Sequence, residues 1–366
     1  MIMTDRDYMQ RALALALKAK GQTSPNPLVG AVIVRGEKVI AEGWHRRCGA
    51  DHAEIVALKK AGDRAKGARL FVNLEPCFHY GRTPPCVDEV IRSGIQEVIL
   101  GMKDPNPLTH GKSVAKLRRA AIPTRVGILR TECEKLNEVF VKYITTGMPF
   151  VATKSAQSLD GKIATASGRS QWITSEKSRQ YARVIRDEFD AILVGINTVM
   201  KDNPGLNPHR KTKKLKKIIL DTTLKISLTA KLFEGMDPRD CLIVTTAAAS
   251  PSKRDALAAR GVTVIIAPPK EGRVDIRWAF KELAKREITS ILVEGGARVI
   301  GSALRENLVD KMYIYTAPKI IGNQRALSSI DGLNGTNVEQ SVRLKNLTMK
   351  PLDDEWLVTG YVFRDR

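Results

Sequence analysis

The amino-acid sequence predicts an α/β protein with two domains, which we place at residues 1–147 and 148–366. With 366 residues the chain is longer than one average domain, and a hydrophobic content of 43% is enough for two cores. In both halves, short apolar runs typical of strands alternate with stretches typical of helices. Gly147 and Pro149 interrupt this alternation just before a new strand, which places the boundary.

The first half opens with a helix over residues 4–20, for which Thr4 is the expected N-cap with Asp7 at the third helical position. Two apolar runs around the turn RGEK then predict a hairpin. The hairpin strands and the elements after them are expected at 30–34, 39–43, 52–62 (helix), 69–74 (strand), 86–94 (helix), 96–102 (strand), 112–120 (helix) and 132–147 (helix). This order is typical of a sheet with helices on both faces.

The second half begins with a strand in MPFVATKSAQ, near residue 150, and continues the alternation. The expected helices are 175–188, 252–261, 275–286 and 297–307, and the expected strands are 189–195, 216–221, 240–246, 262–267, 289–296 and 311–321. We find no internal repeat between the halves and no low-complexity segment. We therefore expect a second, separate α/β unit.

The formal net charge of +21 indicates anionic partners, such as nucleic acid, a membrane surface or phosphorylated small molecules. The excess is spread over both halves, and its densest run, RKTKKLKK at 210–217, is most simply a solvated loop. No apolar run is long enough for a membrane span, and the first ten residues do not resemble a signal peptide. Five cysteines are few and odd in number, which favours a reducing compartment and a cytoplasmic location over a disulfide framework.

Two short segments, DHAE at 51–54 and VNLEPCFHYGRTPPC at 72–86, contain the residue types of a catalytic zinc site. Zinc in such a site takes three protein ligands in a tetrahedral arrangement and leaves the fourth position to water. The expected ligands are His52 at a helix start, Cys77 after a strand and Cys86 at the next helix start. A helix N-terminus also favours the thiolate form that binds metal.

Glu54 lies two residues after His52, so the two side chains converge only if His52 is in the first turn of its helix. Glu54 would then take a proton from the activated water and pass it to a leaving amine without binding the metal. Simpler interpretations exist for each residue, since Asp51 and Glu54 could form a capping box and both cysteines could be buried hydrophobes. The joint pattern favours the metal site.

The pattern H-x-E followed by P-C and a further cysteine resembles the signature of zinc-dependent nucleobase deaminases. The eight residues between Cys77 and Cys86, with PNPLVG at 25–30 and DPNP at 104–107, resemble the deaminase half of the RibD family of bifunctional riboflavin-biosynthesis enzymes. The resemblance implies a cytidine-deaminase-like three-layer α/β/α domain that uses Zn²⁺. It also implies hydrolytic deamination of 2,5-diamino-6-(5-phosphoribosylamino)pyrimidin-4-one, in which water replaces an exocyclic amine.

The same resemblance assigns three side chains to the deaminase substrate. Asn26 would contact it through the amide, His45 would lie near the same pocket, and Arg82 would bind the phosphate with its guanidinium fork. In plainer interpretations, Asn26 is a turn residue between two prolines, and His45 and Arg82 lie on the surface. The sequence departs from the family pattern at Val56, where a second histidine is common, and at FHY after Cys77.

In the second half, four segments resemble the reductase half of the same family, which is similar in fold to dihydrofolate reductase: VATKSAQSLDGKIA, SQWITS, VGINTVMKDNPGL and VEGGARVIG. In VEGGARVIG a buried strand ends, two glycines allow close approach of a ligand, and free N–H groups at a helix start suit a phosphate. A plain tight turn would also explain the glycines, but the other three segments favour NADPH. The resemblance implies reduction of the ribosyl group to ribityl by hydride from this cofactor.

The resemblance also assigns contacts in the reductase site. The residues expected to contact NADPH are Ala156, Trp172, Thr198, Asp202, Gly295, Gly296 and Ala297. The residues expected to contact substrate are Lys154, Ser170, Arg186, Leu206, His209 and Glu294. His209 stands where the family often has arginine, so either His209 or Arg210 would contact the phosphate. The plainer interpretations are a core tryptophan at Trp172, an exposed charge at Arg186 and a surface acid at Glu294.

We therefore expect a bifunctional hydrolase and oxidoreductase that acts on a small phosphorylated pyrimidine, not on nucleic acid or a membrane, and that forms a homo-oligomer. One alternative is a zinc-dependent tRNA adenosine deaminase with an accessory domain, which fits the charge but not the cysteine spacing, and no aromatic stacking platform is apparent. Another is a zinc-stabilised regulatory or RNA-binding module, although a structural zinc site usually has four protein ligands.

Overall fold

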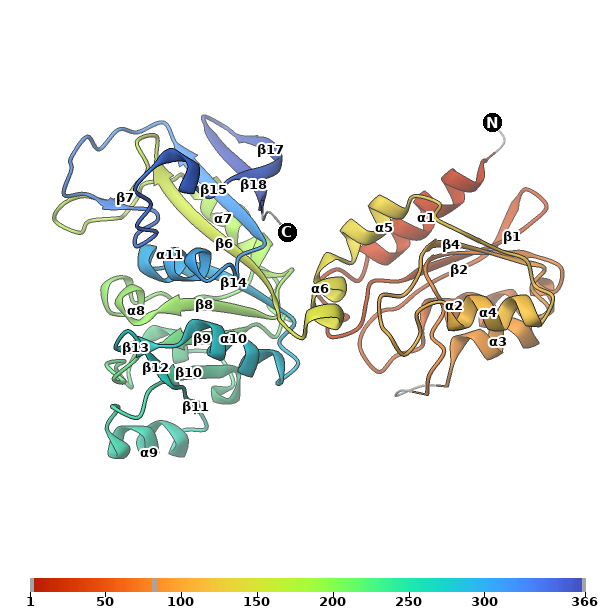
Figure 1. The fold of residues 1–366 in the computed structure, drawn as a ribbon, viewed down its shortest axis with the longest axis horizontal. Helices are drawn as coiled ribbons and strands as arrows, with labels where there is room; N and C mark the ends of the chain where they lie inside the picture. The colour runs from red at the N-terminus through yellow and green to blue at the C-terminus, as the bar shows by residue number, and fades with distance from the viewer. Residues whose placement is uncertain (1–2, 81–83, 364–366) are drawn as a thin grey trace. The chain divides into compact units, whose positions relative to one another are not determined.

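The computed structural model describes residues 3–80 and 84–363 (Figure 1). The chain divides into two compact units, Met1–Met148 and Pro149–Arg366. Both units combine sheets with helices, so the expected α/β fold class is confirmed. Among the described residues, no helix is both long enough and apolar enough to cross a membrane.

The first unit is built on a sheet that contains, over its described residues, five strands in the order β2-β1-β3-β4-β5. The strands are β1 (Gly30–Arg35), β2 (Lys38–Trp44), β3 (Arg69–Leu74), β4 (Glu97–Met102) and β5 (Thr124–Val126). The expected hairpin pairs β1 with β2 in antiparallel orientation, and β3, β4 and β5 run parallel. β5 was not expected, because its three residues are too few to give a strand-length apolar run.

Helices cover both faces of this sheet, as a three-layer domain requires. α1 (Asp5–Leu17) and α5 (Arg130–Leu136) lie on one side, and α2 (Ala53–Ala61), α3 (Cys86–Arg92) and α4 (Lys112–Arg119) lie on the other (Figure 1). One glycine on each side lets a helix lie close against the sheet. A Cβ atom at Gly30 would lie 2.0 Å from the Ala12 carbonyl oxygen in α1, and one at Gly43 would lie 2.2 Å from the Ala53 carbonyl oxygen in α2.

The helix expected over 132–147 consists of two helices, α5 and α6 (Glu138–Thr146), which meet at Asn137. The buried Asn137 side chain accepts a hydrogen bond from the Leu28 amide at 2.8 Å and donates one to the Leu28 carbonyl at 3.0 Å. The backbone of Asn137, with φ −103° and ψ 21°, leaves the helical region. The prediction of one continuous helix was wrong because this contact across the fold leaves no mark on the local periodicity.

The second unit contains, within residues 149–363, a nine-stranded sheet in the order β11-β10-β9-β8-β14-β6-β15-β18-β17. Its strands are β6 (Phe150–Ser158), β8 (Ala191–Gly195), β9 (Lys216–Leu220), β10 (Cys241–Thr245), β11 (Thr263–Ile266), β14 (Ser290–Gly295), β15 (Lys311–Ala317), β17 (Leu344–Leu352) and β18 (Glu355–Val362). Neighbours from β11 to β15 are parallel, and β18 is antiparallel to β15 and β17. Two short sheets pair β12 (Pro269–Lys270) with β13 (Arg273–Val274) and β16 (Leu327–Ser328) with β7 (Lys162–Ala164).

The helices of the second unit are α7 (Glu176–Arg186), α8 (Ile196–Asp202), α9 (Pro251–Ala259), α10 (Ile276–Ala284) and α11 (Ala297–Arg305). Each helix and strand expected in this half has an observed counterpart within a few residues. α8 and the hairpin of β17 and β18 were not expected. β17 lies at the edge of the sheet with residues 345–351 exposed, so it lacks the apolar alternation by which a half-buried strand is predicted.

Candidate active sites

His52, Cys77 and Cys86 come together in the first unit. His52 is the N-cap of α2, Cys77 lies in the loop after β3, and Cys86 is the first residue of α3. The His52 Nδ1 atom lies 3.0 Å from Cys86 Sγ and 3.5 Å from Cys77 Sγ, and the three atoms all lie within 4.8 Å of one another. One imidazole and two sulfurs at these separations match the ligand types of a zinc ion.

The protonation of the two thiols also suits a cation. Hydrogen bonds from the Cys86 thiol, from His52 and from the Cys86 amide lower the pKa of Cys77 to about 4, although burial opposes this shift. The hydrogen bond to Cys77 and burial raise the pKa of Cys86. A cation would balance the Cys77 thiolate and allow the buried Cys86 thiol to ionise as well. His52, Cys77 and Cys86 therefore fit Zn²⁺.

Glu54 is the second residue of α2 and is buried beside these ligands, with 3% of its surface exposed. Burial raises the pKa of Glu54 to about 7, and the nearby His52 opposes the rise. In the part of the chain that the structure describes, the group of possible metal ligands holds His52, Cys77 and Cys86 and no fourth residue. A structural zinc site would be closed by a fourth protein ligand, so this arrangement matches a catalytic site instead.

Asn26 and His45 form a second polar pair next to the ligands. The Asp51 carbonyl can only accept, so the His45 Nδ1–H group donates to it at 3.1 Å, and Nε2 accepts from the Asn26 amide at 3.1 Å. Burial lowers the pKa of His45 and favours this neutral ring. The His45 and His52 rings lie 5.2 Å apart, edge to face. The structure thus brings Asn26 and His45 to the ligand cluster, whereas Arg82 lies outside the described residues.

Two buried asparagines that were not predicted from the sequence fix the loop after Asn26. Asn73 in β3 donates to the Leu28 carbonyl at 2.9 Å and accepts from the Gly30 amide at 2.8 Å. Asn137 contacts the same Leu28 from between α5 and α6. Asn73 is recognisable as a polar residue within the apolar run RLFVNL, but nothing in the sequence around Asn137 marks it.

Glu75, two residues before Cys77, was not predicted either. Its buried carboxylate accepts four backbone N–H groups, at distances of 2.9 to 3.2 Å. The donors are Asp104, Gly111, Ser113 and Val114. The carboxylate therefore ties the loop after β4 and the start of α4 to the segment that carries Cys77. Its signal in the sequence is an acidic residue directly after an apolar run.

In the second unit, Lys154, Arg186 and Glu294 converge from β6, α7 and β14. The Arg186 guanidinium donates two hydrogen bonds to Glu294, from Nε to Oε1 at 2.7 Å and from Nη2 to Oε2 at 2.8 Å. The Lys154 Nζ atom lies 3.9 Å from Glu294 Oε2. Burial opposes ionisation of Glu294, but Arg186 and Lys154 hold its pKa below the ordinary value. Arg186 is therefore the partner of a buried carboxylate and not an isolated surface charge.

The turn between β14 and α11 shows the close approach that its two glycines predict. Gly296 is the N-cap of α11 and has φ +72°, which side chains rarely adopt. A Cβ atom at Gly295 would lie 2.9 Å from the Thr198 Oγ1 atom in α8. Four of the residues expected to contact NADPH are therefore neighbours, namely Thr198, Gly295, Gly296 and Ala297.

The other residues expected to contact NADPH are more dispersed. The Ser170 hydroxyl donates to Asp202 Oδ1 at 3.4 Å, which joins one expected substrate contact to one expected cofactor contact. Ala156 lies on β6 in register with β15. Trp172 is 61% exposed, and the Arg179 guanidinium lies 4.0 Å from its ring centre. Trp172 is therefore not a core tryptophan, so its plainer interpretation is wrong.

A buried lysine that was not predicted, Lys217 in β9, is linked to the Arg186 side chain through Asn207. Leu206 is buried, and the carbonyl of the next residue, Asn207, accepts from Arg186 Nη1 at 2.7 Å. Lys217 is 2% exposed and donates to Asn207 Oδ1 at 3.1 Å and to the Leu232 carbonyl at 2.7 Å. Burial lowers the pKa of Lys217 to about 8. Lys217 is the second residue of β9 and the last residue of the basic run 210–217, which was expected to be a solvated loop, so the sequence gives no hint of its burial.

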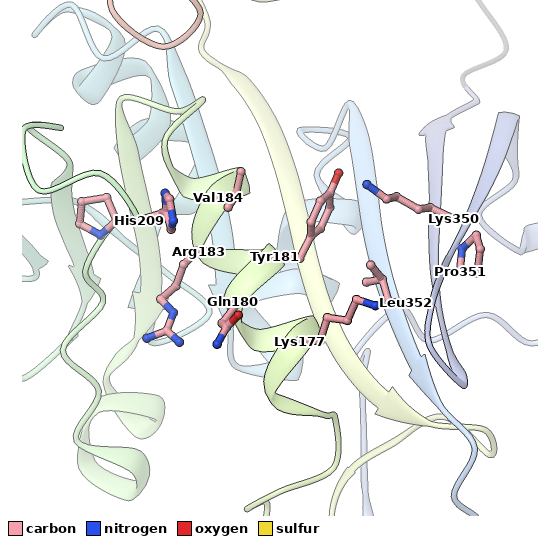
Figure 2. A pocket seen from close by; sticks show the side chains of 10 residues that line it. Lys177, Gln180, Tyr181, Arg183, Val184, His209, Lys350, Pro351 and Leu352 are labelled. Atoms are coloured by element: carbon pink, nitrogen blue, oxygen red, sulfur yellow. The ribbon is translucent and has the colours of Figure 1, made fainter.

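His209 and Arg210, the two candidates for phosphate contact, are both attached to the buried Asp187. The Asp187 carboxylate accepts the backbone amides of His209 at 3.0 Å and of Arg210 at 3.1 Å, and also the Arg210 Nε at 3.2 Å. The His209 ring lines a pocket of about 650 Å³ together with residues of α7 and β17 (Figure 2). Arg186 and Glu294 are not among the residues that line this pocket.

Comparison with known proteins gives matches to both units. Residues 149–358 match the family described as RibD C-terminal domain, and residues 2–102 match the cytidine and deoxycytidylate deaminase zinc-binding region. The riboflavin biosynthesis protein RibD of Aquifex aeolicus (strain VF5) is 42% identical over 356 residues, which is 97% of each chain.

Two solved structures are similar over almost the whole chain. RibD of Acinetobacter baumannii, in its form 1, has a TM-score of 0.88 at 36% identity and covers 98% of this chain and 99% of its own. The diaminohydroxyphosphoribosylaminopyrimidine deaminase/5-amino-6-(5-phosphoribosylamino)uracil reductase of Thermotoga maritima has a TM-score of 0.84 at 35% identity, with the same coverage. The likeness therefore extends over both units and keeps their order.

Proposed function

Because the chain belongs to the RibD family of bifunctional deaminases and reductases of riboflavin biosynthesis, we propose that it carries out two consecutive steps on one phosphorylated pyrimidine. The first step is hydrolytic deamination of 2,5-diamino-6-(5-phosphoribosylamino)pyrimidin-4-one. The second is NADPH-dependent reduction of the ribosyl group to ribityl. We assign deamination to residues 1–147 and reduction to 148–366, and the positions of the two matched regions support this division.

In the deaminase site, His52, Cys77 and Cys86 would hold Zn²⁺, which when bound supplies the Lewis acidity that makes water nucleophilic near neutral pH. Glu54 accepts a proton from the attacking water and gives it to the departing amine, so that oxygen adds to the ring carbon and ammonia leaves. The position of Glu54, buried beside the ligands but not among them, supports this role.

We place the pyrimidine ring beside Asn26 and His45. The neutral His45 ring accepts one N–H of Asn26, which fixes the amide plane and leaves its oxygen as an acceptor for a ring substituent. Arg82 is assigned to the phosphate from the family resemblance. The deaminase would thus recognise both ends of its substrate, the ring by an amide and the phosphate by a guanidinium.

In the reductase site, NADPH supplies the hydride, and the protein has to align the reacting atoms and exclude water. We propose that the cofactor is held by Thr198 and the turn 295–297, together with Ala156, Trp172 and Asp202. We propose that the ribosyl phosphate is held by Lys154, Arg186 and Glu294, together with Ser170, Leu206 and His209. The convergence of Lys154, Arg186 and Glu294 supports this assignment, because charged groups in one place suit hydroxyls and phosphate.

One observation carries the proposed function most directly: three ligand atoms lie within 4.8 Å of one another, with a buried glutamate beside them that is not a fourth ligand. The test is incubation of the purified zinc-loaded chain with the diaminopyrimidinone substrate, with and without NADPH. We expect ammonia release in both cases and oxidation of NADPH only after deamination. No ammonia release would refute the deaminase assignment, whereas ammonia release without NADPH oxidation would refute only the reductase assignment.

We further propose that the enzyme is a cytoplasmic homo-oligomer that binds neither nucleic acid nor membranes. None of the five cysteines, all of which lie in the described part of the chain, is in a disulfide, which fits a reducing compartment. Light scattering after size-exclusion chromatography measures the number of subunits, and a single-subunit mass would contradict the oligomer. A tRNA-binding titration at low and high salt tests the alternative of a nucleic-acid enzyme, which strong salt-dependent binding would favour.

A further inference from the structure

A buried hydroxyl on β15, that of Tyr315, has no hydrogen-bond partner. Within residues 3–80 and 84–363, it is one of four buried side-chain polar atoms in this state. Tyr315 is 1% exposed, and buried hydroxyls in folded proteins are nearly always bonded. Tyr8 shows the usual case, because it is equally buried and its hydroxyl donates to the Glu37 carbonyl at 2.7 Å. A buried hydroxyl without a partner lowers the stability of the free chain, which points to a partner that arrives with a ligand.

Tyr315 lies where the contacts expected for the cofactor and for the reductase substrate meet. β15 runs parallel to β6, and Tyr315 is opposite Ala156 (Figure 1). Side chains alternate between the two faces of a sheet, so Tyr315, Ala156 and Lys154 lie on the same face. The Lys154 ammonium is 5.8 Å from the centre of the Tyr315 ring and 3.9 Å from Glu294 Oε2. The Tyr315 ring therefore borders the charged cluster that we assign to the substrate.

The Tyr315 hydroxyl is protonated before any ligand binds. Burial raises its pKa, Glu294, Tyr181 and Glu188 add to the rise, and Arg186 opposes it. None of these groups forms a hydrogen bond with the hydroxyl. The hydroxyl is therefore a donor whose proton is not yet in use.

The charged cluster beside Tyr315 determines what a ligand must offer. Lys154 and Arg186 can only donate hydrogen bonds, and each oxygen of Glu294 already accepts from Arg186. The side chains of these three residues are at most 18% exposed, so a substrate that reaches them enters a nearly closed space. The movement that admits the substrate would uncover the Tyr315 hydroxyl as well. What this hydroxyl lacks is an acceptor, and a sugar oxygen provides one.

We propose that Tyr315 is a further catalytic residue of the reductase, whose hydroxyl donates to the ring oxygen, O4′, of the ribosyl group. This inference rests on the proposed reduction of ribosyl to ribityl. Tyr315 borders Ala156, an expected cofactor contact, and Lys154, an expected substrate contact. This position suits O4′, because O4′ is bonded to C1′, the carbon that has to meet the cofactor.

The reduction needs a proton at O4′. The C1′–O4′ bond breaks with its electron pair going to O4′, and C1′ gains the hydride that the cofactor supplies. Tyr315 gives its proton to O4′ as negative charge develops there, and a proton from solvent restores the hydroxyl after the product leaves. The Lys154 ammonium, close to the ring, stabilises the negative charge that Tyr315 carries in between.

The test variant is Tyr315→Phe in the full chain, which removes only the hydroxyl. Reductase kinetics are measured with the deaminated substrate and NADPH, and calorimetry gives the melting temperature. We expect kcat to fall by about 100-fold or more, as loss of a general acid predicts, with the KM for NADPH unchanged. The melting temperature should equal or exceed that of the wild type, because the hydroxyl has no partner to lose. The matched control, Tyr8→Phe, removes a hydroxyl that is bonded, so it should lower the melting temperature and leave the reductase kcat unchanged.

The outcomes separate this inference from the proposed function. A wild type that does not oxidise NADPH with the deaminated substrate would refute the proposed reduction and this inference with it. With an active wild type, an unchanged kcat in Tyr315→Phe would overturn the role of the hydroxyl alone. A lower kcat with a lower melting temperature would also overturn it, because the hydroxyl would then have a structural partner in the free chain. A higher KM for the pyrimidine substrate with an unchanged kcat would overturn the assignment to O4′, since the hydroxyl would contact another part of the substrate.

Discussion

The two units assemble their sites in different ways. In the first unit, the ligands lie in short segments at positions set by local structure: His52 caps a helix, Cys77 follows a strand and Cys86 starts a helix. In the second unit, Arg186 and Glu294 are 108 residues apart in the chain and meet because the sheet and α7 bring them together. One site therefore depends on the identity of a few side chains, whereas the other depends on the fold as a whole.

The two sites also differ in how their charges are balanced. The first cluster gathers an imidazole and two sulfurs, which are electron-pair donors that need a cation. The second pairs its buried carboxylate with a guanidinium from the same chain. The first site should therefore fail through loss of its metal, with the fold intact, whereas the second should fail together with the stability of its unit. Substitutions in each unit test this difference.

The largest effect is expected for Cys86→Ala, which removes one of three ligands. Zinc affinity should fall by more than the about 10- to 100-fold that loss of a second-shell group causes, and ammonia release should fall with it. Oxidation of NADPH with already deaminated substrate should stay at the wild-type rate. Metal analysis and the two activity assays measure this, with Cys48→Ala, outside the ligand group, as the control. Loss of both activities in Cys86→Ala would contradict the separation of the sites.

The next largest effect is expected for Arg186→Met, which leaves the Glu294 carboxylate buried without its main partner. Breaking a buried ion pair in this way costs about 3–5 kcal/mol of unfolding free energy. Reductase activity should be lost, and urea denaturation should show the destabilisation. Arg183→Met, one helical turn earlier on an exposed part of α7, is the matched control. If both variants are equally stable, the second site does not depend on this pair.

A smaller effect is expected for Glu75→Gln, which tests whether the first site also depends on a distant support. The glutamine NH₂ group would face backbone donors, and buried N–H groups left without an acceptor cost about 1–3 kcal/mol. Urea denaturation should show this loss, and ammonia release should weaken because the loop after β4 is no longer held to the Cys77 segment. Glu89→Gln serves as the control, because Glu89 forms only an exposed ion pair with Arg92 on α3. Unchanged stability and activity would show that the four hydrogen bonds are dispensable.

The smallest effect is expected for Lys217→Met. Lys217 is linked to Arg186 only through Asn207, so its loss should raise the reductase KM for substrate a few-fold. A pH dependence distinguishes this lysine from others. Above about pH 8 the folded chain has lost the Lys217 proton, while the unfolded chain keeps it up to about its ordinary pKa of 10.5. The unfolded state then binds more protons, so the unfolding free energy should rise with pH in this window.

Urea denaturation between pH 7 and 10 measures that rise, and Lys217→Met should lack it. Lys216→Met, the partly exposed neighbour that pairs with Asp240, is the control and should keep the wild-type pH dependence. An identical pH dependence in the wild type and Lys217→Met would show that Lys217 keeps its proton in the folded chain.

The fold class and the convergence of the ligands could be predicted from the sequence because both follow local patterns. Apolar runs marked the strands, and the positions of His52, Cys77 and Cys86 at element ends could be inferred without any long-range contact. The supports could not be predicted in this way. Asn137 acts on a residue 109 positions away, and Glu75 acts on amides 29 to 39 positions away. No local sequence pattern indicates such a contact. The exposed edge strand β17 likewise lacks the apolar alternation by which a strand is predicted.

Asn137 has a consequence for dividing the chain into separately expressed proteins. The matched zinc-binding region ends at residue 102, yet the Leu28 backbone, two residues from Asn26, is held by a side chain far beyond that point. A fragment cut at residue 102 would keep all three ligands and still lose this anchor, whereas a fragment cut after α6 would retain it. Natural gene fission, or grafting of this unit onto a new partner, should therefore carry α5 and α6 along, although neither helix supplies a metal ligand.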